Sequence, residues 1–400
     1  MKKILCFIVV LSAASTFAQK PMDSILASDI KMLTKFFPGA ERGLTNAAYQ
    51  MEPAAFVSRL DSFRNFAYMS VHADALRRKD IDAFARMMLS MYKQDYGIDS
   101  ALSAQYYELA MKEERPDSSM QLKLDRLSSE MFRKKLTDDE SKQLDSLIFG
   151  GLDIKDSALF MTSNAYRQMV SMKLREIQNR KYADTTKDES ISKQRMLDEV
   201  LGDGYVYEYE SHENIDFVLN TSKDSTLIAD VYERYMARAK NHSFRDNIAT
   251  ALKNFRSLAK HSPAPNFVYR DINEKMVSLK QLKGKYVYID IWATWCGPCK
   301  MEIPHLTKLE EKYAGKKIHF VSLSVDKQKD KAAWGKYVKS HQLKGIQVMA
   351  DKDFKSDFIQ KFNITYIPRF ILIDPAGKIV DANALRPSDQ ELTKQLDQLL

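Results

Sequence analysis

Apolar residues recur at three- and four-residue intervals along residues 19–261, which is the spacing of one face of an α-helix. One example is a stripe of five apolar residues on a single helix face: Tyr166, Met169, Val170, Leu174 and Ile177. Glycine and proline are scarce in this part of the chain. The alternating run YVYEY, residues 205–209, fits either a strand or part of a helix. The pattern predicts an all-helical N-terminal domain, with residues 205–209 left open.

The methionine and aromatic residues of these stripes favour packing between helices, because methionine fills irregular gaps in a core. An exposed binding or dimerisation face is the alternative. No motif in this region indicates a chemical role, so the helical domain is one of unknown role.

The pattern changes near residues 259–267, AKHSPAPNF, where two prolines and a serine interrupt the helical spacing. Short apolar runs typical of strands then alternate with helical segments. The predicted strands are residues 285–292, 318–325, 346–349, 369–373 and 378–381, and the predicted helices are residues 299–313, 329–340, 354–362 and 388–400. Strands separated by helices favour parallel crossovers, while a Pro-Ala-Gly turn after the fourth strand and the run at 267–279 predict two antiparallel hairpins. Residues 262–400 therefore predict an α/β sandwich around a central sheet.

The first residues of the chain, MKKILCFIVVLSAASTFAQK, combine two lysines with a short apolar run and small residues near Ala18. This is the pattern of a secretory signal peptide, and we expect cleavage after Ala18 and export to the periplasm or cell envelope. A membrane anchor is the alternative, but such a helix needs about 20 apolar residues. The predicted organisation is a signal peptide at 1–18, a helical domain at 19–261 and an α/β domain at 262–400.

The formal net charge of +8 is compatible with a nucleic-acid partner. The basic residues are spread along the chain without an interleaved aromatic stripe, however, so we expect a solvated basic surface and no nucleic-acid partner. The chain has three cysteines, and removal of the signal peptide takes Cys6. Only Cys296 and Cys299 then remain, with scattered histidines, so we expect no metal and no cofactor apart from this cysteine pair.

Cys296 and Cys299 stand in WATWCGPCKMEIP, residues 292–304, where a predicted strand gives way to a helix. The thiolate is the form that attacks a disulfide, and unpaired N–H groups at the start of a helix favour an anion. This predicts Cys296 as the attacking nucleophile, accessible to partners, and Cys299 as the resolving thiol one turn inside the helix. A structural disulfide is the alternative, but so short a loop would contribute little stability. We expect Trp292 and Trp295 to be exposed beside the pair as a recognition surface.

The WCGPC motif in this context resembles the thioredoxin superfamily over roughly residues 262–400, which implies a thioredoxin-like α/β sandwich acting on protein disulfides. Asp290, six residues before Cys296, matches a buried acid that relays a proton to the resolving thiol. Pro304 matches a proline that kinks the active-site helix. Ile367 and Pro368 match a cis-proline loop that faces the dithiol and holds the substrate chain.

The resemblance implies that four residues bind substrate around the dithiol: Trp295, Gly297, Pro298 and Ile367. Arg369 stands where thioredoxins commonly have threonine, which leaves client preference open.

An additional helix-strand unit near residues 329–349 and the leading hairpin resemble the TlpA/ResA-like envelope group. That resemblance implies a membrane-coupled reductant, often serving cytochrome c maturation, and places Asp326 near an active-site acid of some members. His305 is expected on the helix surface. The Gly-Pro pair between the cysteines is that of thioredoxin, so we expect a reductant with a potential below about −220 mV. A reductant in an oxidising compartment must be recharged, which implies a membrane-bound electron donor.

Two other functions remain open. A disulfide isomerase would require a homodimer formed through the helical domain. A client-binding or assembly module would use the helical region, with the cysteine pair in a secondary redox role.

Overall fold

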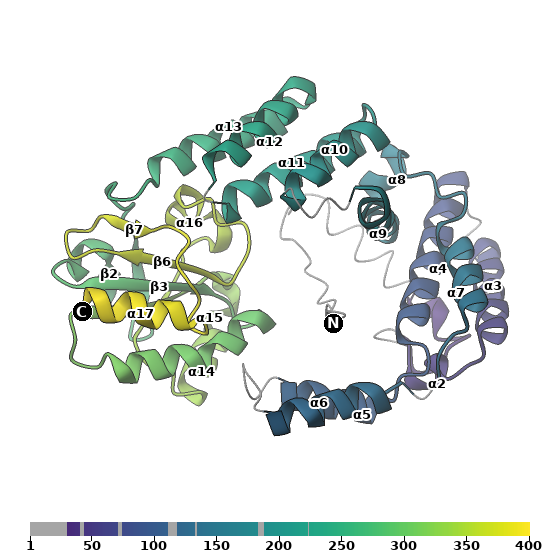
Figure 1. Ribbon diagram of the computed structural model, residues 1–400, viewed down its shortest axis with the longest axis horizontal. Coiled ribbons are helices and arrows are strands. Elements are labelled where there is room, and N and C mark those ends of the chain that lie inside the picture. Colours follow the sequence, from purple (N-terminus) through teal and green to yellow (C-terminus); the bar gives the residue numbers. More distant parts are fainter. Residues whose placement is uncertain are drawn as a thin grey trace. The chain divides into compact units, whose positions relative to one another are not determined.

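The computed structural model describes residues 30–40, 44–70, 74–110, 118–132, 134–182, 188–222 and 224–400 (Figure 1). These residues belong to two compact units, and the chain passes from one to the other between Ser211 and His212. The predicted signal peptide, with Cys6 and the cleavage site after Ala18, lies outside the described residues. Within the ranges given above, no helix has the length and apolar character needed to cross a membrane.

The unit before His212 is built from helices, as predicted. They are α2 (Asn46–Tyr49), α3 (Pro53–Ser70), α4 (Ala75–Asp95), α5 (Ser100–Ala110), α6 (Ser118–Glu130), α7 (Asp138–Phe149), α8 (Ser157–Thr162), α9 (Asn164–Lys181), α10 (Glu189–Val200) and the first part of α11 (Tyr205–Thr221). Residues 205–209, which the pattern left open, begin α11. The stripe from Tyr166 to Ile177 lies on α9 and packs into the core, which confirms packing rather than an exposed face for these residues.

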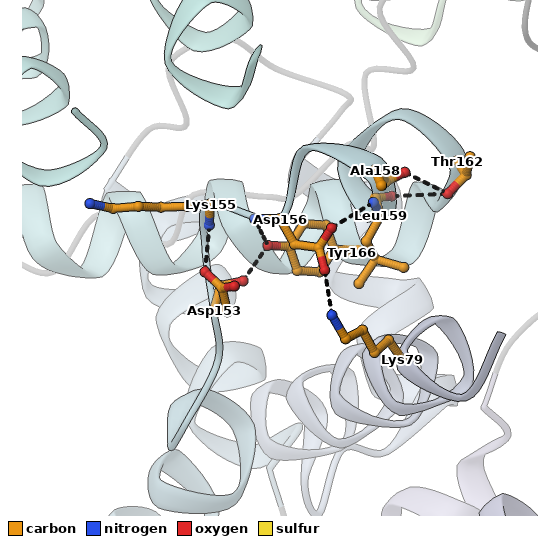
Figure 2. A network of polar contacts seen from close by, with 8 residues as sticks. All are labelled: Lys79, Asp153, Lys155, Asp156, Ala158, Leu159, Thr162 and Tyr166. Atoms are coloured by element: carbon orange, nitrogen blue, oxygen red, sulfur yellow. Dashed lines mark hydrogen bonds and ion pairs between the residues drawn. The ribbon is translucent and has the colours of Figure 1, made fainter. Parts of the chain in front are cut away.

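A polar network fixes the start of α8 beside α4 and α9 (Figure 2). The Asp156 carboxylate accepts a hydrogen bond from the backbone N–H of Leu159 at 3.0 Å, which caps α8, and it pairs with Lys79 Nζ at 2.6 Å. The Tyr166 hydroxyl accepts a hydrogen bond from the backbone N–H of Asp156 at 3.2 Å and donates one to the carbonyl of Asp153. These charges therefore serve the packing of three helices.

The unit from His212 onward contains the end of α11, two further helices and a mixed sheet. The two helices are α12 (Ser225–Arg238) and α13 (His242–Ser257). The strands are β1 (Val268–Asp271), β2 (Met276–Ser278), β3 (Tyr286–Trp292), β4 (Ile318–Ser324), β5 (Ile346–Met349), β6 (Arg369–Ile373) and β7 (Ile379–Asp381). The helices after the first hairpin are α14 (Gly297–Lys312), α15 (Lys331–Ser340), α16 (Asp357–Lys361) and α17 (Gln390–Leu399).

The strand order is β2-β1-β5-β4-β3-β6-β7. The three central strands β3, β4 and β5 run parallel, while β6 and β7 and the β1–β2 hairpin are antiparallel to their neighbours. The parallel crossovers predicted from β3 to β4 and from β4 to β5 are confirmed, as are both predicted hairpins. The crossover expected from β5 through α16 to β6 is wrong, because β6 runs antiparallel to β3. Apolar residues on both faces of β3, β4 and β6 enter two buried clusters, so the sheet is covered on both sides, as α/β sandwiches require.

The compact unit begins at His212, ahead of the predicted domain boundary at residue 262. The boundary predicted from the pattern marks the place where helices give way to strands. The unit reaches further back because side chains on α11 and α13 are hydrogen-bonded to the loop that precedes β6.

Candidate redox site

Cys296 is the N-cap residue of α14, and it forms a disulfide with Cys299 with a Cα–Cα separation of 5.3 Å. The strand-to-helix position predicted for the pair is thus confirmed. Pro298 lies in the first turn of α14, where its fixed φ suits a helix start. The backbone N–H of Cys299 donates a hydrogen bond to Cys296 Sγ at 3.1 Å. The first turn of α14 therefore directs a donor at the sulfur that would carry negative charge.

Cys296 was expected to be accessible, but only 5% of its surface is exposed in the disulfide form, against 3% for Cys299. Both cysteines belong to the buried apolar cluster that also contains residues of β3 and β4. Gly297, between the two cysteines, borders open space, since a Cβ added there would meet no atom within 4 Å.

The two tryptophans beside the pair differ in exposure. Trp295 is 59% exposed, as predicted, and its ring lies 6.4 Å from that of Phe354. The predicted exposure of Trp292 is wrong, because only 1% of its surface is accessible. Trp292 is the last residue of β3, and its ring packs against Tyr337 at 5.7 Å in the core of the domain. Trp295 alone of these two can contact a partner.

Asp290 lies in the middle of β3 and is buried, with 6% of its surface exposed. Burial raises the pKa of its carboxyl group well above the usual value, and the negative charges of Glu302 and Glu310 raise it further. The burial expected from the thioredoxin resemblance is observed. The raised pKa favours the protonated form of the carboxyl group relative to an exposed aspartate.

Glu302 was not identified from the sequence, although it is a buried acid of the same site. It follows Cys299 by three residues on α14, and its carboxylate accepts hydrogen bonds from Ser388 Oγ at 3.0 Å and from the Ser388 backbone N–H at 3.1 Å. Arg386 Nη1 lies 3.9 Å away. The spacing from Cys299 could have indicated it, since residues three apart share a helix face.

The Ile367-Pro368 peptide bond is cis, as predicted. Arg369 follows it as the first residue of β6 and is buried, with 6% of its surface exposed. Its guanidinium donates hydrogen bonds to the carbonyl of Ala382 at 3.2 Å and to the carbonyl of Asn220. Its side chain thus turns into the protein.

Asp326 follows β4 and holds the turn that leads into the cysteine motif. Its carboxylate accepts hydrogen bonds from the backbone N–H and the hydroxyl of Thr294, at 2.9 and 2.7 Å, and from Ser324 Oγ at 2.8 Å. Pro304 lies inside α14, and His305 is partly exposed on the same helix. In the part of the chain that the structure describes, no group of three or more His, Cys, Asp or Glu side chains is arranged to hold a metal ion.

The site combines a disulfide between two cysteines separated by two residues at a helix N-terminus, a buried acid on the adjacent central strand and a cis-proline before β6. These features define a thioredoxin-like redox domain. Comparison with known proteins agrees with this class. Residues 259–400 match the family model described as Redoxin.

Two curated relatives are both named thiol-disulfide oxidoreductase ResA. The protein from Bacillus cereus (strain ZK / E33L) is 38% identical over 118 residues, which are 30% of this chain and 65% of that protein, slightly under two thirds of its length. The protein from Bacillus thuringiensis subsp. konkukian (strain 97-27) is 32% identical over 136 residues, which are 34% of this chain and 76% of that protein. The chain belongs, through its C-terminal region, to the ResA-like thiol-disulfide oxidoreductases of the thioredoxin superfamily.

Two solved structures from Bacteroides are also similar. The thioredoxin domain of a thiol-disulfide oxidoreductase from Bacteroides vulgatus is 33% identical, with a TM-score of 0.32, and the match covers 36% of this chain and 99% of that one. A thiol:disulfide interchange protein from Bacteroides sp. is 34% identical, with a TM-score of 0.32, covering 36% of this chain and 90% of that one.

Proposed function

We propose that this protein reduces disulfide bonds in other proteins, with Cys296 as the attacking thiolate and Cys299 as the resolving thiol. The observation that carries the proposal is the position of Cys296 as the N-cap of α14, bonded to Cys299 and adjacent in sequence to an exposed Trp295. A structural bridge would need none of these features.

The reaction balances as two thiol exchanges. The Cys296 thiolate attacks one sulfur of a client disulfide, which forms a mixed disulfide and releases one client sulfur as a thiolate that takes up a proton. Cys299 then loses its proton and attacks Cys296 Sγ, which releases the second client thiol. Two electrons pass from the dithiol to the client, and the Cys296-Cys299 disulfide is the product.

Asp290 is proposed as the group that accepts the proton from Cys299 in the second exchange. Its raised pKa, caused first by burial and then by Glu302 and Glu310, brings the carboxyl group closer to the range in which it can exchange a proton at neutral pH. Trp295, Gly297, Pro298 and Ile367, together with the backbone at Pro368, are proposed to contact the client chain around the disulfide.

The direction of electron flow is proposed from the dipeptide between the cysteines. Gly297 and Pro298 form the pair that thioredoxin carries, and thioredoxin has a potential of about −270 mV, against about −120 mV for the oxidant DsbA. We propose a reducing role in the periplasm or cell envelope, recharged by a membrane-bound donor, with a cytochrome c precursor as one class of client. The family membership supports disulfide chemistry, and the signal-peptide pattern supports the compartment.

Insulin reduction followed by turbidity tests the proposal, with dithiothreitol as the electron source. We expect the wild-type chain to accelerate precipitation of the insulin B chain and Cys296→Ser to lose this acceleration. Equal rates for the two proteins would overturn the proposal.

A further inference from the structure

The loop that joins α16 to β6, residues 362–368, contains the cis-proline and is bonded to helices that precede the sheet. Thr365 Oγ1 donates a hydrogen bond to Asp216 Oδ2 on α11 at 2.9 Å. Both residues belong to the compact unit that starts at His212. A residue 149 positions earlier in the chain thus holds the loop two residues before Ile367.

Arg369 makes a second connection on the other side of Pro368. Its guanidinium bonds to the carbonyl of Asn220, to which Asn383 Nδ2 also donates at 3.3 Å. Asn220 lies one turn after Asp216, so both contacts come from one face of α11. Its carbonyl is among the last four of the helix, which lack partners inside the helix, and a cation is favoured at this end. The buried guanidinium and the end of α11 therefore satisfy each other.

Two asparagines connect the same loop to α13. Asn363 Nδ2 donates to the carbonyl of Ala251 at 2.6 Å, while Asn254 Nδ2 donates to Asn363 Oδ1 at 3.1 Å and to the carbonyl of Gln360 at 3.2 Å. The first residues of the loop are thus attached to α13, and the residues on both sides of the cis-proline are attached to α11.

We propose that α11 and α13 form a brace that positions the cis-proline loop for binding of the client chain, with Arg369 as its principal positioning residue. The inference rests on the proposed function, because it assigns this loop to client binding. A threonine, which thioredoxins commonly carry after the cis-proline, is too short to reach Asn220. The brace gives α11 and α13 a defined part in the redox reaction.

The brace acts on the binding of a polypeptide, not on the chemistry of the sulfurs. Fixing the backbone of residues 365–368 in its binding conformation lowers the entropy cost of pairing with an extended client chain. A small aromatic disulfide has no chain for the loop to hold. Loss of the brace should therefore raise KM for protein substrates and leave the rate with a small disulfide almost unchanged.

The experiment compares Arg369→Met, Arg369→Lys and Thr365→Val with the wild type. Arg270→Met is the matched control, since Arg270 is an exposed arginine of the same unit that pairs with Glu274 on the surface. We expect KM for insulin to rise roughly tenfold in Arg369→Met and roughly threefold in Thr365→Val, because each loses a bond that orders the loop. Arg369→Lys keeps the charge but not the forked geometry and should fall between wild type and Arg369→Met.

Two further readouts separate positioning from general destabilisation. Reduction of 5,5′-dithiobis(2-nitrobenzoate) should stay within about twofold of wild type in all variants. Hydrogen exchange at the amides of residues 362–370 should be faster in Arg369→Met and Thr365→Val and unchanged in Arg270→Met. An unchanged KM together with unchanged exchange in folded Arg369→Met would end the proposal.

Thr365 is exposed, so Thr365→Val is the test variant if Arg369→Met does not fold. Unchanged hydrogen exchange and unchanged KM in Thr365→Val would equally end the proposal. Failure of the proposed function looks different. If the wild type reduced no polypeptide disulfide, the assignment as a client reductase would fall. Exchange in the variants would then still decide whether the brace orders the loop.

Discussion

The backbone N–H of Cys299 points at Cys296 Sγ over 3.1 Å, within the first turn of α14. In the reduced protein this donor and the helix N-terminus favour the thiolate of Cys296. We expect Cys296 in the reduced Cys299→Ser variant to react with iodoacetamide at pH 7 roughly fivefold or more faster than free cysteine. A rate equal to that of free cysteine would contradict the assigned role.

Asp290 should make the stability of the protein depend on pH. Its pKa is raised in the folded state, so the folded protein binds the proton more tightly than the unfolded chain does. The associated stability is fully present below the ordinary pKa of an aspartate and is lost as pH rises through the raised value. Asp290→Asn should therefore gain at least about 1 kcal/mol in free energy of unfolding relative to wild type at pH 9. Urea unfolding at pH 4 and pH 9 measures this, and an equal difference at both pH values would refute it.

The same substitution should slow catalysis while leaving the first thiol exchange intact. An asparagine cannot accept the proton from Cys299, so we expect the steady-state rate of insulin reduction to fall at least about tenfold in Asp290→Asn. Alkylation of Cys296 in the reduced variant serves as the control and should remain within about twofold of wild type. A loss of alkylation instead would place the defect at Cys296.

Glu302 should shift the pH at which Asp290 acts. Its negative charge raises the pKa of Asp290, so Glu302→Gln should lower that pKa and move the acid limb of the rate profile to lower pH. Glutamine can still accept a hydrogen bond from Ser388, which limits the structural effect. The pH dependence of insulin reduction is measured in Glu302→Gln and in the double variant Asp290→Asn/Glu302→Gln. If Glu302 acts through the pKa of Asp290, the shift seen in the single variant is absent from the double variant. A shift that persists without Asp290 would count against the coupling.

The two tryptophans should respond in opposite ways. Trp292→Ala removes a buried ring and should cost about 3–5 kcal/mol in free energy of unfolding. Trp295→Ala should change stability by less than about 0.5 kcal/mol and raise KM for protein substrates. Urea unfolding and insulin kinetics on both variants provide the comparison, and equal destabilisation would be inconsistent with the exposures found.

The α/β region could be predicted because its local signals agree with one another. Apolar runs of strand length alternate with helical spacing, and the cysteine motif places the junction of β3 and α14. Residues 205–209 could not be decided because YVYEY carries aromatic and β-branched residues in alternation, while packing in the folded chain makes them helical. The exposure of Trp292 was predicted wrongly although the predicted strand 285–292 ends at this residue, because its burial depends on Tyr337, 45 positions away in the chain.

Contacts between distant segments lay beyond what the sequence pattern shows. The buried charge of Glu302 depends on Ser388, 86 positions away, and Arg369 depends on Asn220, 149 positions away. An isolated glutamate on a helix and an arginine at a strand start are typical of solvated surfaces. Only the fold brings their partners to them.

The reduction potential tests the central claim most directly. The oxidised and reduced forms are equilibrated with glutathione or dithiothreitol buffers and quantified by alkylation of Cys296 and Cys299. A reductant of protein disulfides requires a potential below about −220 mV, and this is the expected result. A value near −120 mV, that of a strong oxidant, would contradict the account.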